Sequence, residues 1–191
     1  GFTSMASRYG DTELAVSSII MKLFMFFSYF VDGFAYAGEA LVGKAIGESK
    51  VENPKVLTST PIKVESVVRA LFYWAIGVGL VFTVIYAVWG QDCIALMTND
   101  ATVLAAAKKY MGWLIAMPIV SALAFMWDGI YVGATAGVPI RNAMIWAAVG
   151  FVLLYVATYR WVGVQALYIA YFAHLIARVI YLSVKWEKLR I

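Results

Sequence analysis

The chain has 191 residues, of which 63% are hydrophobic and 14% are charged, and its formal net charge is +4. Soluble domains carry about 25% charged residues, and a soluble fold keeps too much solvated surface to hide this many apolar side chains. We therefore exclude a soluble globular domain and expect an integral membrane protein. The basic residues lie mostly between apolar segments, which indicates membrane topology rather than nucleic-acid binding.

Five apolar segments follow a polar start at residues 1–12, and each is long enough to cross a bilayer, which takes about 20 residues. They are expected at residues 13–47, 70–91, 110–134, 142–159 and 161–183. The first is long for one span, so we expect it to tilt, kink or project. The third contains Pro118, which removes a backbone hydrogen bond and bends a helix. The predicted fold is an all-α, polytopic bundle of transmembrane helices forming one domain.

The polar connections carry local signals of their own. Residues 48–65 form the longest connection, and residues 64–69 predict an amphipathic lead-in to the second span. Residues 94–97 predict a short surface helix. Residues 98–100, Thr-Asn-Asp, predict the N-cap of the helix that follows.

The basic residues divide unequally between the two sides of a five-span protein. One side carries Arg8, Lys108, Lys109 and Arg160; the other carries Lys44, Lys50, Lys55, Lys63, Arg69, Arg141, Lys185, Lys188 and Arg190. The positive-inside rule places the richer side, with the C-terminus, in the cytoplasm, and we expect a multi-pass protein of the inner cell membrane. The chain then starts outside without a signal peptide, so we expect that at least one upstream helix is missing.

Two acids interrupt apolar, aromatic segments. Asp32 lies in residues 26–41, and Asp128 lies in residues 125–133, again after aromatics and before glycine. A charge at a membrane helix centre costs about 2.5–3.5 kcal/mol on insertion scales, so such residues usually face protein or water. One interpretation is a proton- or cation-binding site in a transporter. The other is a structural carboxylate that bonds to backbone or pairs with a buried Lys or Arg.

Other polar and aromatic residues have open interpretations. Glu39 follows Asp32 by two helical turns, so it either lines the same cavity or pairs with Lys44 or Lys63. His174 fits hydrogen-bonded structure better than a proton relay. Four aromatic residues either attract a cation by cation–π contact or are core or lipid-facing: Tyr29, Phe30, Trp127 and Tyr131. Two small-residue series predict close helix packing: Gly43 and Gly47, and Gly129, Gly133 and Gly137.

Enzyme chemistry has no support in the sequence, and no cofactor or metal site is expected. Cys93 is the single cysteine, which excludes an internal disulfide and a multi-cysteine metal site. No Gly-rich phosphate loop, HExxH motif or Cys–His nucleophile pair is present. Asp-Gly pairs occur in CDP-alcohol phosphotransferases, but these need an arginine shortly after the pair. No arginine follows Asp32-Gly33 at that distance.

Three stretches resemble the multidrug and toxic compound extrusion (MATE) transporters, most closely the DinF-like branch. The run Phe27-Ser28-Tyr29-Phe30-Val31-Asp32-Gly33-Phe34-Ala35-Tyr36-Ala37-Gly38-Glu39-Ala40-Leu41-Val42-Gly43-Lys44-Ala45-Ile46-Gly47 resembles their eighth helix. Asp128-Gly129-Ile130-Tyr131-Val132-Gly133-Ala134-Thr135 resembles the end of the tenth, and Gly163-Val164 with Arg178 resembles the twelfth. The resemblance implies helices eight to twelve of twelve, most of the second six-helix lobe, without the first lobe.

The resemblance also implies a function. Its members are secondary antiporters that export cationic amphipathic compounds in exchange for H⁺ or Na⁺, so the implied partners are such compounds, the bilayer and the N-terminal lobe. A principal proton-binding aspartate of the DinF-like branch lies in that lobe. Asp128 is the nearest match here to a cation-binding acid of the tenth helix, and Asp32 is the candidate for proton or cation binding. The alternatives are a related flippase for lipid-linked oligosaccharides and a non-transporting membrane scaffold.

Overall fold

The structure is a computed structural model that describes residues 2–50 and 63–188. The described residues form helices and turns, with no strand among them. Five stretches are long and apolar enough to cross a membrane: Asp11–Ser49, Val64–Ala95, Ala101–Gly133, Gly137–Val162 and Gln165–Trp186. The expected all-α bundle of five spans is therefore confirmed, and the chain is a multi-pass membrane protein. The residues at which each helix enters and leaves the bilayer stay a prediction. Lys55 and Arg190 lie outside the described residues.

The chain begins with a short reversal before its longest helix. Helix α1 (Phe2–Ala6) and the 3₁₀ turn η1 (Ser7–Tyr9) lead to Gly10, whose φ of 108° favours glycine. Helix α2 (Asp11–Ser49) then runs for 39 residues. At about 1.5 Å per residue it measures about 58 Å, roughly twice the hydrocarbon core of a bilayer. It must therefore tilt or extend beyond the membrane, as the sequence predicts.

Helix α3 (Val64–Ala95) includes residues from two segments that were predicted to lie outside the second span. Residues 64–69 form its first turns, with Val67 and Val68 buried and Arg69 exposed, so the amphipathic lead-in is confirmed. The prediction of a separate surface helix at residues 94–97 is wrong. Ile94 is fully buried, and α3 continues through Ala95 and carries this side chain into the core.

The next span is built from α4 (Ala101–Ala107), η3 (Lys108–Tyr110) and α5 (Met111–Gly133). The N-cap prediction is confirmed, because the Asp100 carboxylate accepts hydrogen bonds from the backbone N–H groups of Thr102 at 2.8 Å and Val103 at 3.4 Å. Helical structure thus begins about nine residues before the expected span at 110.

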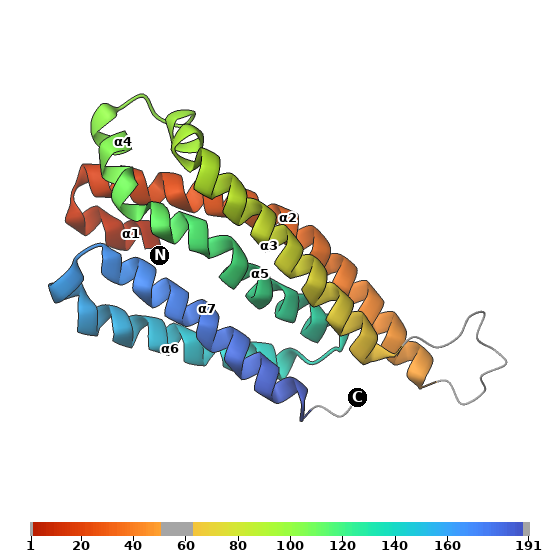
Figure 1. Ribbon diagram of the computed structural model, residues 1–191. Coiled ribbons are helices and arrows are strands. Elements are labelled where there is room, and N and C mark those ends of the chain that lie inside the picture. Colours follow the sequence, from red (N-terminus) through yellow and green to blue (C-terminus); the bar gives the residue numbers. More distant parts are fainter. Residues whose placement is uncertain (1, 51–62, 189–191) are drawn as a thin grey trace.

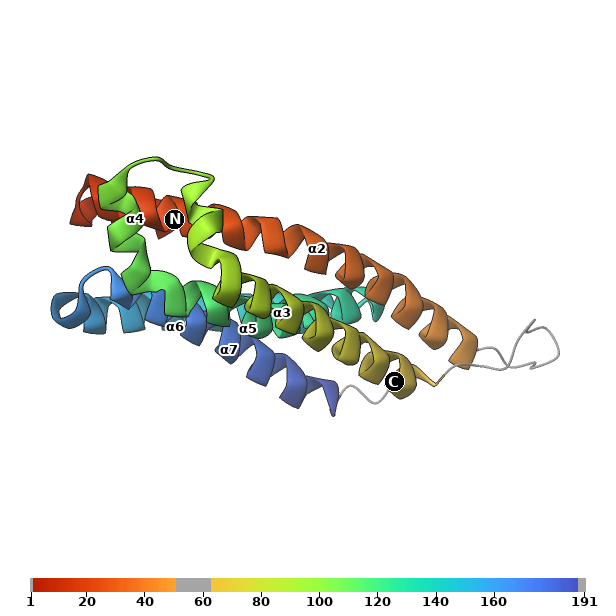
Figure 2. The same cartoon turned by 45° about the horizontal axis from the view of Figure 1, so that its top comes forward.

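Helix α5 lies at the centre of the bundle, between the α2–α3 pair and α7 (Gln165–Trp186) (Figures 1 and 2). Its interior Pro118 cannot donate a backbone hydrogen bond. Near this position the hydroxyl of Thr83 on α3 donates to the carbonyl oxygen of Ile115 at 3.0 Å. A neighbouring helix therefore makes a polar contact within one turn of the proline.

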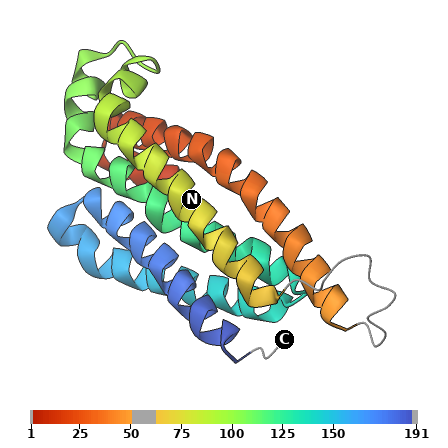
Figure 3. The ribbon, with the colours of Figure 1, turned by 45° about the vertical axis from the view of Figure 1, so that its right-hand side comes forward.

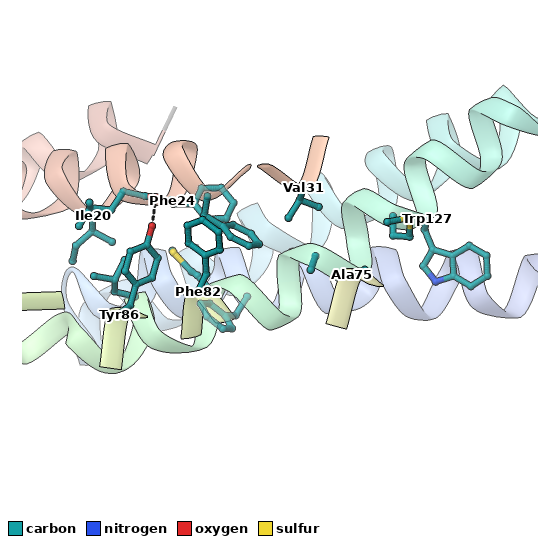
Figure 4. Close-up of a cluster of buried hydrophobic side chains, with 14 of the residues drawn as sticks. Ile20, Phe24, Val31, Ala75, Phe82, Tyr86 and Trp127 are labelled. Carbon is teal, nitrogen blue, oxygen red and sulfur yellow. Dashed lines mark hydrogen bonds between the residues drawn. The ribbon is translucent and has the colours of Figure 1, made fainter. Parts of the chain in front are cut away.

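Helices α2 and α3 share an aromatic core. Phe82 and Tyr86 of α3 face Ile20 and Phe24 of α2 in Figure 4. The hydroxyl of Tyr86 is buried and donates to the carbonyl oxygen of Leu23 at 2.7 Å. This bond satisfies a polar group that would otherwise be costly in an apolar interior.

Glycines set the close approach of α2 and α5. A Cβ atom added at Gly129 would overlap the backbone of Ala35, and one added at Gly133 would overlap the backbone of Glu39. A Cβ at Gly43 would meet the Gly133 carbonyl oxygen at 3.3 Å. The packing prediction is confirmed for these three glycines. It is wrong for two others, which have open space around them in the described structure: Gly47 and Gly137.

Helices α6 (Gly137–Val162) and α7 form an antiparallel hairpin along one side of the bundle (Figures 1 and 3). Gly163, with φ 56°, allows the turn between them. The hairpin contacts the rest of the bundle mainly where α7 packs on α5. There, the buried hydroxyl of Tyr131 on α5 donates to the carbonyl oxygen of Leu182 at 2.6 Å.

Candidate functional site

A buried ion pair joins α5 to α7. The guanidinium Nη2 of Arg178 donates to the carboxylate Oδ2 of Asp128. The Arg178 side chain is 8% exposed and that of Asp128 is 24% exposed. The two residues are 50 positions apart in sequence, and the packing of α7 on α5 brings them together. Of the two interpretations of Asp128, the structure shows the pairing with a buried arginine.

The pair is only partly satisfied. Within the described part of the chain, the buried Oδ1 of Asp128 and the buried Nε of Arg178 have no hydrogen-bond partner. An unpaired buried polar atom costs free energy comparable to a lost hydrogen bond, and more for a charged group. The Oδ1 atom of Asp128 therefore keeps an unmet hydrogen-bonding capacity, which a proton or a cation bound there would satisfy.

Further titratable groups, Asp32 and His174 among them, lie around the pair. Asp32 of α2 interacts electrostatically with Asp128, so the two acids singled out in the sequence lie in the same region. His174 also interacts with both members of the pair, and its ring hydrogen-bonds to the backbone of Ala147 on α6. This bond agrees with the structural interpretation of the histidine.

Glu39 stands apart from this group. Its side chain is half-buried, and its backbone lies against Gly133 at the crossing of α2 and α5. Lys44, one proposed partner, instead forms an ion pair with Glu48 at 3.7 Å. No ion pair between Glu39 and either Lys44 or Lys63 occurs among the described residues, so that pairing is wrong. A role for Glu39 in the cavity stays a prediction.

The four candidate aromatic residues separate into two pairs. Tyr29 and Phe30 are 67% and 50% exposed on the outer face of α2. Trp127 and Tyr131 are buried on α5 and pack against Trp186 of α7, with ring centroids 5.7 and 5.6 Å away. The structure does not bring the pairs into one cavity. Cation binding by either pair stays a prediction.

A second polar cluster, near the N-terminal end, was not predicted from the sequence. Glu13 is hydrogen-bonded by the hydroxyl of Tyr110, and its Oε2 is buried without a hydrogen-bond partner among the described residues. Nearby, Tyr168 of α7 lies 3.3 Å from the hydroxyl of Ser17. Glu13 follows a polar stretch and precedes the apolar run, so the sequence offers no sign of its burial.

Tyr9 adds a link at the same end of the bundle. Its hydroxyl lies 3.1 Å from that of Tyr155 on α6. Burial, followed by the hydrogen bond with Tyr155, raises the pKa of Tyr9 to about 12. Tyr9 therefore stays a neutral hydroxyl at physiological pH and ties η1 to α6 without adding charge.

Comparison with known proteins gives relatives along nearly the whole chain. The MatE family model matches residues 2–159. The chain is 33% identical over 186 residues to DNA damage-inducible protein F of Escherichia coli (strain K12), covering 97% of this chain and 38% of that protein. It is also 26% identical over 131 residues to Protein DETOXIFICATION 45, chloroplastic, and 24% over 132 residues to Protein DETOXIFICATION 42, both of Arabidopsis thaliana.

Those two matches cover 69% of this chain and 22% and 24% of the plant proteins. The chain thus spans well under half the length of the curated relatives it matches. No solved structure matches it significantly. The family model covers most of the residues, and the bacterial relative confirms the resemblance drawn from the helix sequences. The chain belongs to the MatE family, the multidrug and toxic compound extrusion proteins.

Proposed function

We propose that this chain forms most of one lobe of a secondary antiporter that exports cationic amphipathic compounds in exchange for H⁺ or Na⁺. Family membership and five membrane-crossing helices support transport, and the names of the two plant relatives contain the word DETOXIFICATION. The chain spans 38% of the bacterial relative. In this proposal the remainder of a longer polypeptide supplies the other lobe, and substrate binds between the two lobes, which rock during alternating access.

The observation that carries the proposal is the partly satisfied pair of Asp128 and Arg178 inside the membrane helices. Intramembrane ionisable residues are expensive and mark ion or substrate pathways by default. Here the arginine neutralises one carboxylate, while Asp32 brings a second into the same electrostatic environment. When both acids are ionised, the three groups carry a net charge of −1, which favours binding of one cation.

The same excess charge provides coupling. A proton or Na⁺ at Asp128 or Asp32 removes the negative charge that attracts a cationic substrate. Binding of the substrate in turn disfavours the ion, and this mutual exclusion is the reciprocal linkage that an antiporter needs. In this proposal the ion binds at the unpartnered Oδ1 of Asp128.

The arrangement of basic residues favours cation export over an oligosaccharide flippase. A pyrophosphate-linked substrate needs free cationic side chains in the cavity. Arg178 is already engaged by Asp128, and Lys22 is exposed near the other end of the bundle. An experiment distinguishes a transporter from a non-transporting scaffold, because a scaffold should tolerate neutral residues at both Asp32 and Asp128.

The test is ion-driven uptake of a fluorescent cationic dye by everted membrane vesicles containing the full-length protein. We expect Asp128→Asn and Asp32→Asn to lose most uptake at matched expression, whereas Asp92→Asn, at an exposed acid late in α3, keeps it. Replacing a pH gradient by a Na⁺ gradient identifies the coupling ion. Wild-type uptake by both aspartate variants would make these carboxylates structural and overturn their proposed role.

A further inference from the structure

An apolar groove runs between α6 and α7. Its volume is about 550 Å³, and it is open along one side. That volume falls within the roughly 300–1,000 Å³ that small-molecule sites occupy. Its lining residues are Ala143, Trp146, Ala147, Ala177, Ile180, Tyr181, Val184 and Lys185.

The walls suit a hydrocarbon chain. Three alanines leave space between the helices, while Ile180 and Val184 supply branched apolar sides. From Ala177 to Lys185 is eight residues, so along α7 the groove runs for about 12 Å at about 1.5 Å per residue. Both helices are membrane-spanning candidates, and the exposed apolar walls at Ile180 and Val184 suit the acyl region of the bilayer.

The charge at one end of the groove is positive. Lys185 lies in the last turn of α7 and lines the groove, and its Nζ sits 5.9 Å from the centroid of the Tyr181 ring. Arg141 near the start of α6 and Lys188 after α7 are exposed at the same end of the hairpin. Glu187 is the acid beside them, and α6 contains no acid, so the described residues at this end of the hairpin carry a net charge of +2.

We propose that this groove binds an anionic phospholipid, with one acyl chain between α6 and α7 and the phosphate at Lys185. Lysines near a membrane surface attract anionic headgroups, and the amphipathic ring of Trp146, 68% exposed, suits the interface. One acyl chain fills the space between the apolar walls of the groove, and the lysine selects the headgroup. The site is independent of the compound that is transported.

The experiment is native mass spectrometry of the full-length protein after equilibration in nanodiscs that contain phosphatidylglycerol and phosphatidylethanolamine. Lys185→Ala should lower retained phosphatidylglycerol about fivefold, the effect of one lysine near an anionic surface, and leave phosphatidylethanolamine unchanged. Lys108→Ala, at an exposed lysine of η3 near the other end of the bundle, is the matched charge control and should retain both lipids as the wild type does.

A second variant tests the acyl chain. Ala177 is exposed, so Ala177→Phe fills the groove without disturbing the core and should reduce retention of both lipids. Ala148→Phe, at an exposed alanine of α6 outside the lining, should bind as wild type does. Equal phosphatidylglycerol retention in wild type and Lys185→Ala would overturn the headgroup assignment. Unchanged retention in Ala177→Phe, or cross-linking of this groove to another protein segment, would overturn the acyl site.

Discussion

Asp128, the third residue of Met-Trp-Asp-Gly, could be singled out from sequence because a charge in an apolar span is expensive. Its ion-pair partner could not be predicted from the sequence. Arg178 is 50 residues from Asp128, and only the packing of α7 on α5 joins them. The burial of Glu13 was missed for a related reason, since the side chains that enclose it come from η3 and α7.

Neutralising one member of the ion pair should destabilise the protein more than neutralising both. Asp128→Asn leaves Arg178 as a buried, uncompensated charge, for which we expect a loss of about 3–5 kcal/mol. The double variant Asp128→Asn/Arg178→Gln removes that charge and should recover part of the loss. Thermal unfolding of the detergent-solubilised full-length protein measures the difference. Additive losses in the double variant would show that the pair contributes nothing as a unit.

At the scale of the helices, hydropathy predicted which segments cross the membrane but not where each helix starts and stops. The apolar core of a span is visible in composition, whereas its ends depend on local contacts. Burial of Ile94 extends α3 past the polar Asp92, and capping by Asp100 starts α4 well before the apolar run. The glycine-containing helix faces were likewise predictable only in part. Spacing predicts a small-residue face, and only the structure shows that Gly129 and Gly133 meet α2 while Gly137 does not.

The crossing of α2 and α5 should fail when a methyl group is added. Gly129→Ala places a Cβ atom against the backbone of Ala35, which has no rotamer to move away, so we expect a loss of about 1–3 kcal/mol. Gly77→Ala is the control, because nothing in the described structure lies within 4 Å of its added Cβ. Chemical unfolding compares the two variants. Equal stability would mean that the helices are not held at this distance.

The start of α4 depends on one side chain. Asp100→Ala removes the acceptor for two backbone N–H groups and should cost about 0.5–2 kcal/mol. Asp100→Asn keeps an oxygen acceptor and should lose much less. Hydrogen exchange at Thr102 and Val103 reports the change locally, and unchanged exchange in Asp100→Ala would contradict the cap.

At the scale of the whole molecule, length and composition predicted a five-span α-helical membrane protein, and the helix motifs predicted its family. The arrangement of the helices was not predictable from hydropathy, since every span is apolar and lipid-facing positions resemble core positions. Helix α5 occupies the centre because its glycines, its proline and Tyr131 each meet a different neighbour. That information resides in pairwise contacts between distant segments.

The distribution of basic residues predicts the orientation of the chain. In a Cys93→Ser background, we expect Asn99→Cys to react with a membrane-impermeant maleimide in intact cells, because residue 99 lies on the less basic side. Glu187→Cys should react only in everted vesicles. Labelling of both positions from the same side, or the reverse pattern, would contradict a cytoplasmic C-terminus.

In the proposed mechanism, cationic substrate and coupling ion compete for the acids around Arg178. The most direct measurement is the affinity of a fluorescent cationic dye for the purified full-length protein across a range of pH and Na⁺ concentrations. We predict that wild-type affinity falls as protons or Na⁺ are added, and that Asp128→Asn binds weakly and with little dependence on either ion. The same ion dependence in wild type and Asp128→Asn would contradict the claim.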